Sequence, residues 1–165
     1  MAVFDHLGEL AVAQDFTAGA GQTTNVVDLA LLGIQGYGPD ADVYIDMECE
    51  TAAAGDSADT FAYEWNVALT TDLDTGTQSV DYWKIICVNI LGVLDVRQTV
   101  AGNKILTCRL PDQVWQLAKE GFRYFGCNVT ISAGSTVSLN VTLSSSKPRT
   151  PDNQQVTTSN VGVPT

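Results

Sequence analysis

The sequence predicts an all-β fold, an antiparallel β-sandwich of the jelly-roll type with about eight strands. Apolar and polar residues alternate with a period of two over many short segments, which is typical of strands that bury one face. Links rich in glycine and small polar residues separate these segments. The 165 residues, 45% of them hydrophobic, suffice for one good core but not for two ordinary domains.

The two ends of the chain depart from this pattern. We expect an N-terminal arm over residues 1–9, a sandwich domain over 10–145 and an extended C-terminal tail over 146–165. The tail is polar and carries three prolines, so it cannot bury enough apolar surface to offset its own ordering entropy. Both arms are therefore expected to be flexible, or to become ordered on a partner.

Four strands are predicted in the first half of the chain. Residues 10–17 and 23–30 form an expected pair, joined by the small-residue link 18–22, and the alternation is clearest in 42–50 and 61–69. The residues of the last two strands expected to face the core are Val43, Ile45, Met47, Cys49, Phe61, Tyr63, Trp65, Val67 and Leu69.

The next segments are less regular. Residues 80–96 are almost continuously apolar, which predicts a central strand covered on both faces and bent at Gly92. Another strand, 104–111, follows a turn at 101–103 and ends at Pro111.

One helix is predicted, over residues 112–120. Asp112 can cap its start and Gly121 ends it, while the apolar stripe consists of Val114, Leu117 and Ala118. An irregular crossover is the alternative interpretation.

The longest alternation in the chain, residues 123–146, predicts a β-hairpin. Its strands would be 124–132 and 136–144, with the turn at 133–135. In the second strand Val137, Leu139, Val141 and Leu143 would face the core.

Charge and hydropathy argue against two classes of partner. Nineteen acidic residues against eight basic ones give a net charge of −11, which opposes an approach to nucleic acid or anionic lipid. The sequence has neither an apolar run of membrane-helix length nor the pattern of a secretory signal, so we expect no membrane partner. The sequons at Asn128 and Asn140 are accordingly interpreted as strand asparagines.

The cysteines do not have the spacing of a metal site. No two of them form a C-x-x-C pair, and the chain has one histidine, His6. Free thiols packed as small hydrophobes are favoured over one or two disulfides, and no metal or cofactor is expected. The four cysteines are Cys49, Cys87, Cys108 and Cys127.

The sequence contains no motif of a hydrolytic triad, a dinucleotide or nucleotide site, or a zinc protease, so we expect no enzymatic activity. Acids at positions 42, 46, 48 and 50 follow one face of a predicted strand, which favours a solvated face. Weak calcium binding and catalysis by paired carboxylates are the alternatives.

The aromatic residues could also form a sugar-stacking platform. Core packing is favoured for Tyr63 and Trp65 because they share a face with aliphatic residues. Tyr82 and Trp83 are adjacent and must point to opposite faces of a strand, so Trp83 is kept as a candidate contact residue.

The segment LPDQVWQLAKEGFRYFGCNVTISAGSTVSLNVTL, residues 110–143, resembles the closing part of the small jelly-roll cement (decoration) proteins of tailed bacteriophages. In that family a proline-ended strand leads to an aromatic-glycine segment, a glycine-containing turn and an alternating last strand. TTNVVDLA, residues 23–30, is similar to the family's first core strand. The likeness spans residues 10–145, and the acidic strand and the long polar tail depart from it.

This resemblance implies a structural virion protein that binds the outer surface of an HK97-like capsid and staples neighbouring major capsid subunits. It also implies assembly in the bacterial cytoplasm and a homo-oligomer, with a dimer favoured over a trimer. The candidate capsid or oligomer contacts are Phe4, Leu7, Leu10, Trp83, Lys147 and Arg149. The alternative is a carbohydrate-binding, phage fibre or baseplate jelly-roll module, which predicts an exposed aromatic platform or a calcium site on one sheet face.

Overall fold

The computed structural model describes residues 8–17, 19–34, 42–54, 60–71, 73, 82–85, 91–92, 100–132 and 134–144. Phe4, His6 and Leu7 of the predicted N-terminal arm lie outside these residues, as does the whole predicted C-terminal tail with Lys147 and Arg149, whereas residues 8 and 9 of the predicted arm are described and Glu9 begins a strand. Cys87 lies outside them too. No helix among the described residues is long and apolar enough to cross a bilayer.

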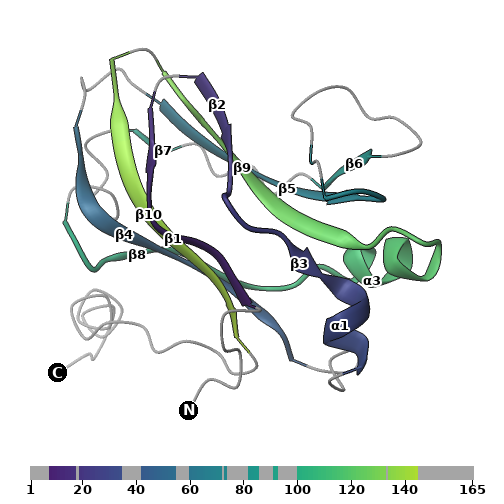
Figure 1. Cartoon of the computed structure of the whole chain (residues 1–165). Helices are drawn as coiled ribbons and strands as arrows, with labels where there is room; N and C mark the ends of the chain where they lie inside the picture. Colours follow the sequence, from purple (N-terminus) through teal and green to yellow (C-terminus); the bar gives the residue numbers. More distant parts are fainter. Residues whose placement is uncertain are drawn as a thin grey trace, which may run out of the picture.

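Two antiparallel sheets pack face to face, so the predicted all-β sandwich is confirmed (Figure 1). Sheet A has, in spatial order, β1 (Glu9–Phe16), β10 (Thr136–Ser144), β4 (Tyr44–Ala54) and β8 (Lys104–Arg109). Sheet B has β2 (Gly19–Gln22), β9 (Tyr124–Ile131), β5 (Thr60–Ala68) and β6 (Tyr82–Ile85); the two-residue β3 (Val27–Asp28) pairs with β9, and β7 (Leu91–Gly92) pairs with β5.

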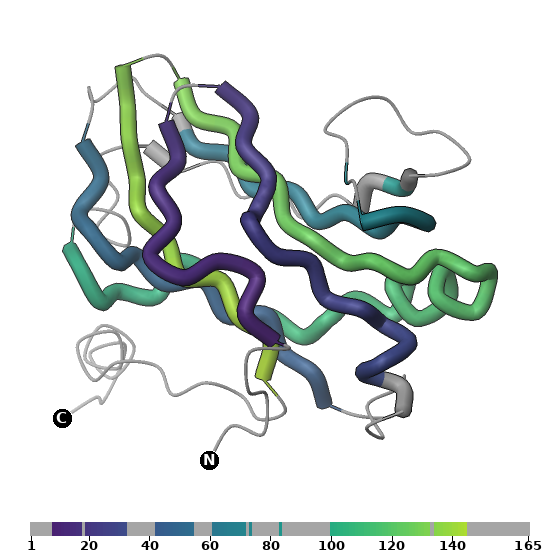
Figure 2. Tube along the Cα trace, in the orientation of Figure 1, coloured from purple at the N-terminus to yellow at the C-terminus, as the bar shows by residue number. Residues whose placement is uncertain are grey.

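The strand order is that of a jelly roll. The strands of four or more residues form nested antiparallel pairs, β1 with β10, β2 with β9, β4 with β8 and β5 with β6, which alternate between the two sheets. Together these nested pairs make one long antiparallel hairpin. The further pairing of β10 with β4 and of β9 with β5 folds this hairpin into two layers. Figure 2 follows the path of the chain through both layers.

The core lies between the sheets and contains most of the predicted residues. In and next to β4 and β5 every predicted core residue is fully buried except Leu69, which follows the end of β5 and is 40% exposed. Trp65 stacks on Phe125 of β9, with ring centroids 5.8 Å apart. Val137, Leu139, Val141 and Leu143 of β10 are also buried, as predicted.

The prediction for the start of the chain is partly wrong. The predicted link 18–22 contains strand β2, and the predicted strand 23–30 contains only β3 before helix α1 (Leu29–Ile34) begins. Asp28 explains the change, because its Oδ1 accepts a hydrogen bond from the Ala30 N–H at 3.0 Å and so caps the helix. Two glycines in β2 hid that strand from a pattern that depends on apolar side chains.

The predicted hairpin at residues 123–146 is also wrong. Strands β9 and β10 form where expected, but β9 belongs to sheet B and β10 to sheet A, so they do not pair. Alternation records that one face of each strand is buried. The alternation is the same for two strands that are neighbours in one sheet and for two strands that face each other across a core.

Of the predicted central strand at 80–96 the structure describes residues 82–85 and 91–92, and these residues do not form one central strand. Strand β6 occupies the end of sheet B and pairs with β5, and the two-residue β7 also pairs with β5. A continuous apolar run indicates burial but does not give a strand's place in the sheet.

Helix α3 (Asp112–Lys119) confirms the predicted helix and rejects the irregular crossover. Its N-cap is Pro111 and no side chain caps it, so Asp112 is the first helical residue, not the cap. At the other end the Phe122 and Gly121 N–H groups donate to the Leu117 and Ala118 carbonyls, and Gly121 has φ +103°. This is a Schellman motif, in which a positive φ favours glycine.

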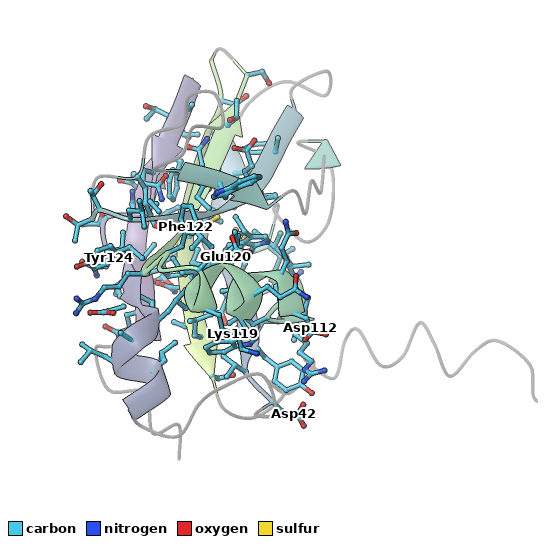
Figure 3. All side chains as sticks on the ribbon, turned by 90° about the vertical axis from the view of Figure 1, so that its right-hand side faces the viewer. Asp42, Asp112, Lys119, Glu120, Phe122 and Tyr124 are labelled. Carbon is cyan, nitrogen blue, oxygen red and sulfur yellow. The ribbon has the colours of Figure 1, made fainter. Side chains whose placement is uncertain are left out.

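Helix α3 packs against the core through Val114, Trp115 and Leu117. Figure 3 shows this end of the molecule, with Asp112, Lys119 and Glu120 labelled along the helix. In Figure 1 α1 and α3 lie at the same side of the sandwich.

Candidate functional site

The candidate contact residues that the structure describes have different surroundings. Leu10 is fully buried in the core, so its side chain is not part of the surface. Trp83 is 36% exposed and lies on β6 opposite Val67, with its ring edge-on to Phe122 at a centroid distance of 6.3 Å. Among the candidate contacts that the structure describes, Trp83 is therefore the one that a partner could reach.

The acidic strand β4 is not simply a solvated face. Asp46 is 7% exposed and forms an ion pair with Lys104 on β8, and Lys104 Nζ is also 2.7 Å from Glu48 Oε2. Thr107 Oγ1 donates a further hydrogen bond to Asp46 Oδ1 at 2.9 Å. Burial alone would lower the pKa of Lys104, but its hydrogen bonds with Asp46 and Glu48 outweigh this and raise the pKa.

These acids cross-link strands and do not gather as a ligand set. Lys104 ties β8 to two positions of β4, while the Asp42–Arg109 pair, at 3.5 Å, is exposed. No group of three or more histidine, cysteine, aspartate or glutamate side chains in the described part of the chain could hold a metal ion.

A second tie crosses three strands of sheet A. Asn140 on β10 accepts a hydrogen bond from the Ala13 N–H of β1 at 2.7 Å and donates one to Glu50 Oε2 of β4 at 2.5 Å. Ala13 has φ +45°, and the strand registers shift around both partner segments. Asn140 therefore stabilises irregular backbone on both sides of β10.

The outer face of sheet B carries a buried group of side-chain amides. Asn66 is fully buried and Asn128 is 3% exposed, and Asn66 Nδ2 donates to Gln22 Oε1 at 3.2 Å. Gln22 Nε2, Asn66 Oδ1 and Asn128 Oδ1 are buried and have no hydrogen-bond partner among the described residues. Gln22 and Leu73 share the space above Gly126, where a Cβ atom would collide with both.

The cysteines follow the favoured prediction as far as the structure describes them. Cys49, Cys108 and Cys127 are not in disulfide bonds among the described residues; Cys49 and Cys127 are buried and Cys108 is half-buried. Burial raises the pKa of the Cys49 and Cys127 thiols. They pack as small apolar groups rather than as nucleophiles.

A shallow depression on the outer face of sheet A was not anticipated from the sequence. It has a volume of about 210 Å³ and its lining includes Asp15, Thr51 and Ser138. Register shifts in the β4–β10 ladder lie on either side of the Ser138–Thr51 pair. Such shifts follow from the pairing of distant segments, so no local pattern could have revealed the depression.

Comparisons of the chain with protein-family models, with curated proteins and with solved structures found no match.

Proposed function

We propose that this chain is a structural virion protein, a cement or decoration protein that binds the outer surface of an HK97-like phage capsid and staples neighbouring major capsid subunits. The observation that carries the proposal is a jelly roll whose sheet A is cross-linked by side-chain hydrogen bonds. The sequence resemblance over residues 110–143 supports the proposal as well. A protein that holds other subunits in place needs a stiff spacer, and this domain has side-chain ties across sheet A in addition to its strand ladders.

The charge supports the proposed location. A net charge of −11 would be repelled by packaged DNA and is compatible with an outward-facing position on a shell. Many copies on one shell would also add avidity without new contacts.

The carbohydrate-binding alternative has less support. Tyr63 and Trp65, the aromatic residues considered for stacking, are fully buried in the core. Trp83 remains partly exposed but packs on Phe122 at a sheet edge, which provides one aromatic face rather than a platform.

The test is to mix the purified chain with empty, undecorated capsids of the phage that encodes it. Cement activity predicts saturable, stoichiometric binding and a rise in the temperature at which the shells open. Binding to glycans without binding to capsids would instead support the alternative function as a carbohydrate-binding module. Size measurements of the isolated chain would separate a dimer from a trimer.

A Trp83→Ala variant and a matched Leu69→Ala variant refine this test. Leu69 is an exposed apolar residue of similar accessibility, at 40% against 36% for Trp83. If Trp83 contacts the capsid, its truncation weakens docking while that of Leu69 does not. Equal docking by both variants and the parent would remove Trp83 from the proposed contact set.

A further inference from the structure

The depression on the outer face of sheet A has the size of a site for one side chain. Its volume of about 210 Å³ exceeds by several times the roughly 30 Å³ that one water molecule occupies, and lies below the usual range of about 300–1,000 Å³ for small-molecule pockets. The lining residues are Asp15 and Thr17 of the β1 end, Thr51 and Ala52 of β4, and Thr136, Val137 and Ser138 of β10.

The carboxylate in this depression differs from the other acids of sheet A. The strands of the sheet contain five acidic residues, Glu9, Asp15, Asp46, Glu48 and Glu50. Lys104 pairs with Asp46 and Glu48, Asn140 binds Glu50, and Glu9 also has an interaction partner. Among the described residues, Asp15 forms no hydrogen bond or ion pair.

Residues with hydroxyl groups line the depression together with this carboxylate. The register places Asp15 opposite Ser138, and Ser138 opposite Thr51, in one row across three strands. Ser138 is only 6% exposed, and within the described ranges neither its hydroxyl nor those of Thr51 and Thr136 form a hydrogen bond. A carboxylate that shares a depression with hydroxyl acceptors matches a compact cation with several N–H donors.

We propose that this depression, the Asp15 pocket, receives a lysine side chain of a partner protein. The ammonium group would lie at the Asp15 carboxylate and donate its remaining protons to the hydroxyl oxygens, while the methylene stem would lie along Ala52 and the threonine methyl groups. The net charge of −11 would favour the approach of a basic surface. A sugar is disfavoured because the described lining residues include no aromatic side chain.

The first test does not depend on the capsid proposal. The ¹⁵N-labelled full chain is titrated with N-acetyl-lysine methylamide and, in parallel, with N-acetyl-norleucine methylamide, which has a stem of the same length without the ammonium group. We expect the lysine probe to cause saturable shifts at the Asp15, Thr51 and Ser138 amides that weaken as salt is added. The norleucine probe should cause none, and equal shifts from both probes would overturn the proposal.

Variants give the second test. Asp15→Asn should weaken binding of the lysine probe about two- to fivefold, as expected for an exposed ion pair. Glu120→Gln removes one charge from the residue that follows α3, which does not line the pocket, and should leave binding unchanged. Thr51→Val keeps the carboxylate and removes one hydroxyl acceptor, so it should weaken binding by a smaller factor. Unchanged binding by Asp15→Asn, or tighter saturation of the pocket by methyl glucoside, would overturn the proposal.

The role of the pocket in docking rests on the proposed function. On capsids that bind the parent chain, Asp15→Asn should dock more weakly than Glu120→Gln. Equal docking by these two variants would overturn the assignment of the pocket to a partner's lysine. Failure of the parent chain to bind capsids would contradict the proposed function, whereas the probe titrations would still decide whether the pocket binds lysine.

Discussion

The side chain of Asn140 on β10 accepts a hydrogen bond from the backbone N–H of Ala13 on β1, with 2.7 Å between Oδ1 and the nitrogen. Ala13 has φ +45°, a region that costs a non-glycine residue about 1–2 kcal/mol. The same amide donates to Glu50 on the opposite neighbour strand. One side chain thus holds two irregular segments in place.

We expect Asn140→Ala to lower the free energy of unfolding by about 1–2 kcal/mol, because two hydrogen bonds are lost and only part of their strength is recovered from water. Urea unfolding measures this. Thr142→Ala is the control, since Thr142 lies two residues away on the same strand and should cost less. A loss no larger than that of the control would show that the tie contributes nothing to stability.

The Lys104 ion pairs give a second prediction. Lys104→Met leaves the carboxylate of Asp46 buried beside an uncharged chain, so we expect a loss of about 2–4 kcal/mol at pH 7. The double variant Lys104→Met/Asp46→Asn removes both charges and should recover at least half of this loss. Asp42→Asn, which breaks the exposed pair with Arg109, should change stability by less than about 0.5 kcal/mol.

Lys104 also predicts a dependence on alkaline pH. Its pKa is raised in the folded chain, so the stability it contributes is complete below the unfolded value of about 10.4 and is lost as the pH rises through the folded value. The difference in unfolding free energy between the parent and Lys104→Met should stay constant from pH 7 to about pH 10 and narrow above it. If the difference in unfolding free energy stayed constant above pH 10, the stabilisation would not come from the charge of Lys104.

Asp28 predicts the opposite behaviour, in acid. Its hydrogen bonds with the Arg123 guanidinium lower its pKa below 3.8, so this stabilisation is present above the unfolded value and is lost as the pH falls through the folded one. Asp28→Asn keeps a helix-capping side chain but loses the ion pair, whereas Asp28→Ala loses both. We expect Asp28→Asn to lie between the parent and Asp28→Ala at pH 6, and to approach the parent as the pH falls below 3.8, as followed by circular dichroism.

The sequence predicted individual strands better than their partners. The residues of β4, β5 and β10 that face the core were found because burial of one face leaves a period of two. The pairing of β9 and β10 was mistaken because a strand in the facing sheet has the same period. Helix α1 was missed because a six-residue helix has too few turns to show its periodicity, and its signal is the single cap at Asp28.

Site features depended even more on tertiary structure. The acids of β4 form a visible run, but their partner Lys104 lies 58 positions from Asp46 and became its neighbour only through the β4–β8 ladder. Asp15 stands out because it has no partner in the part of the chain that the structure describes, and that can be seen only once the neighbouring strands are known. Trp83 was identified as a contact candidate from its adjacency to Tyr82, and it is indeed partly exposed.

The free cysteines predict a chemical behaviour. In the native chain, iodoacetamide should modify half-buried Cys108 before Cys49 and Cys127, because those two thiols are buried and burial raises their pKa. Peptide mass spectrometry after timed quenching gives the order. In urea the three rates should become similar. Early modification of Cys127 in the native chain would mean that β9 opens on the time scale of the reaction.

Gly126 provides a prediction about packing on the outer face of sheet B. A methyl group at this position would collide with the ends of Leu73 and Gln22, which lie above it, so we expect Gly126→Ala to cost about 1–3 kcal/mol. Leu73→Ala alone should also destabilise, by the loss of a side chain that is 6% exposed. If the two residues compete for one space, the double variant Gly126→Ala/Leu73→Ala will be more stable than the sum of the single losses predicts. Additive losses would show that Leu73 does not occupy the space above Gly126. Leu73 would then not cover the side-chain amides of Gln22, Asn66 and Asn128.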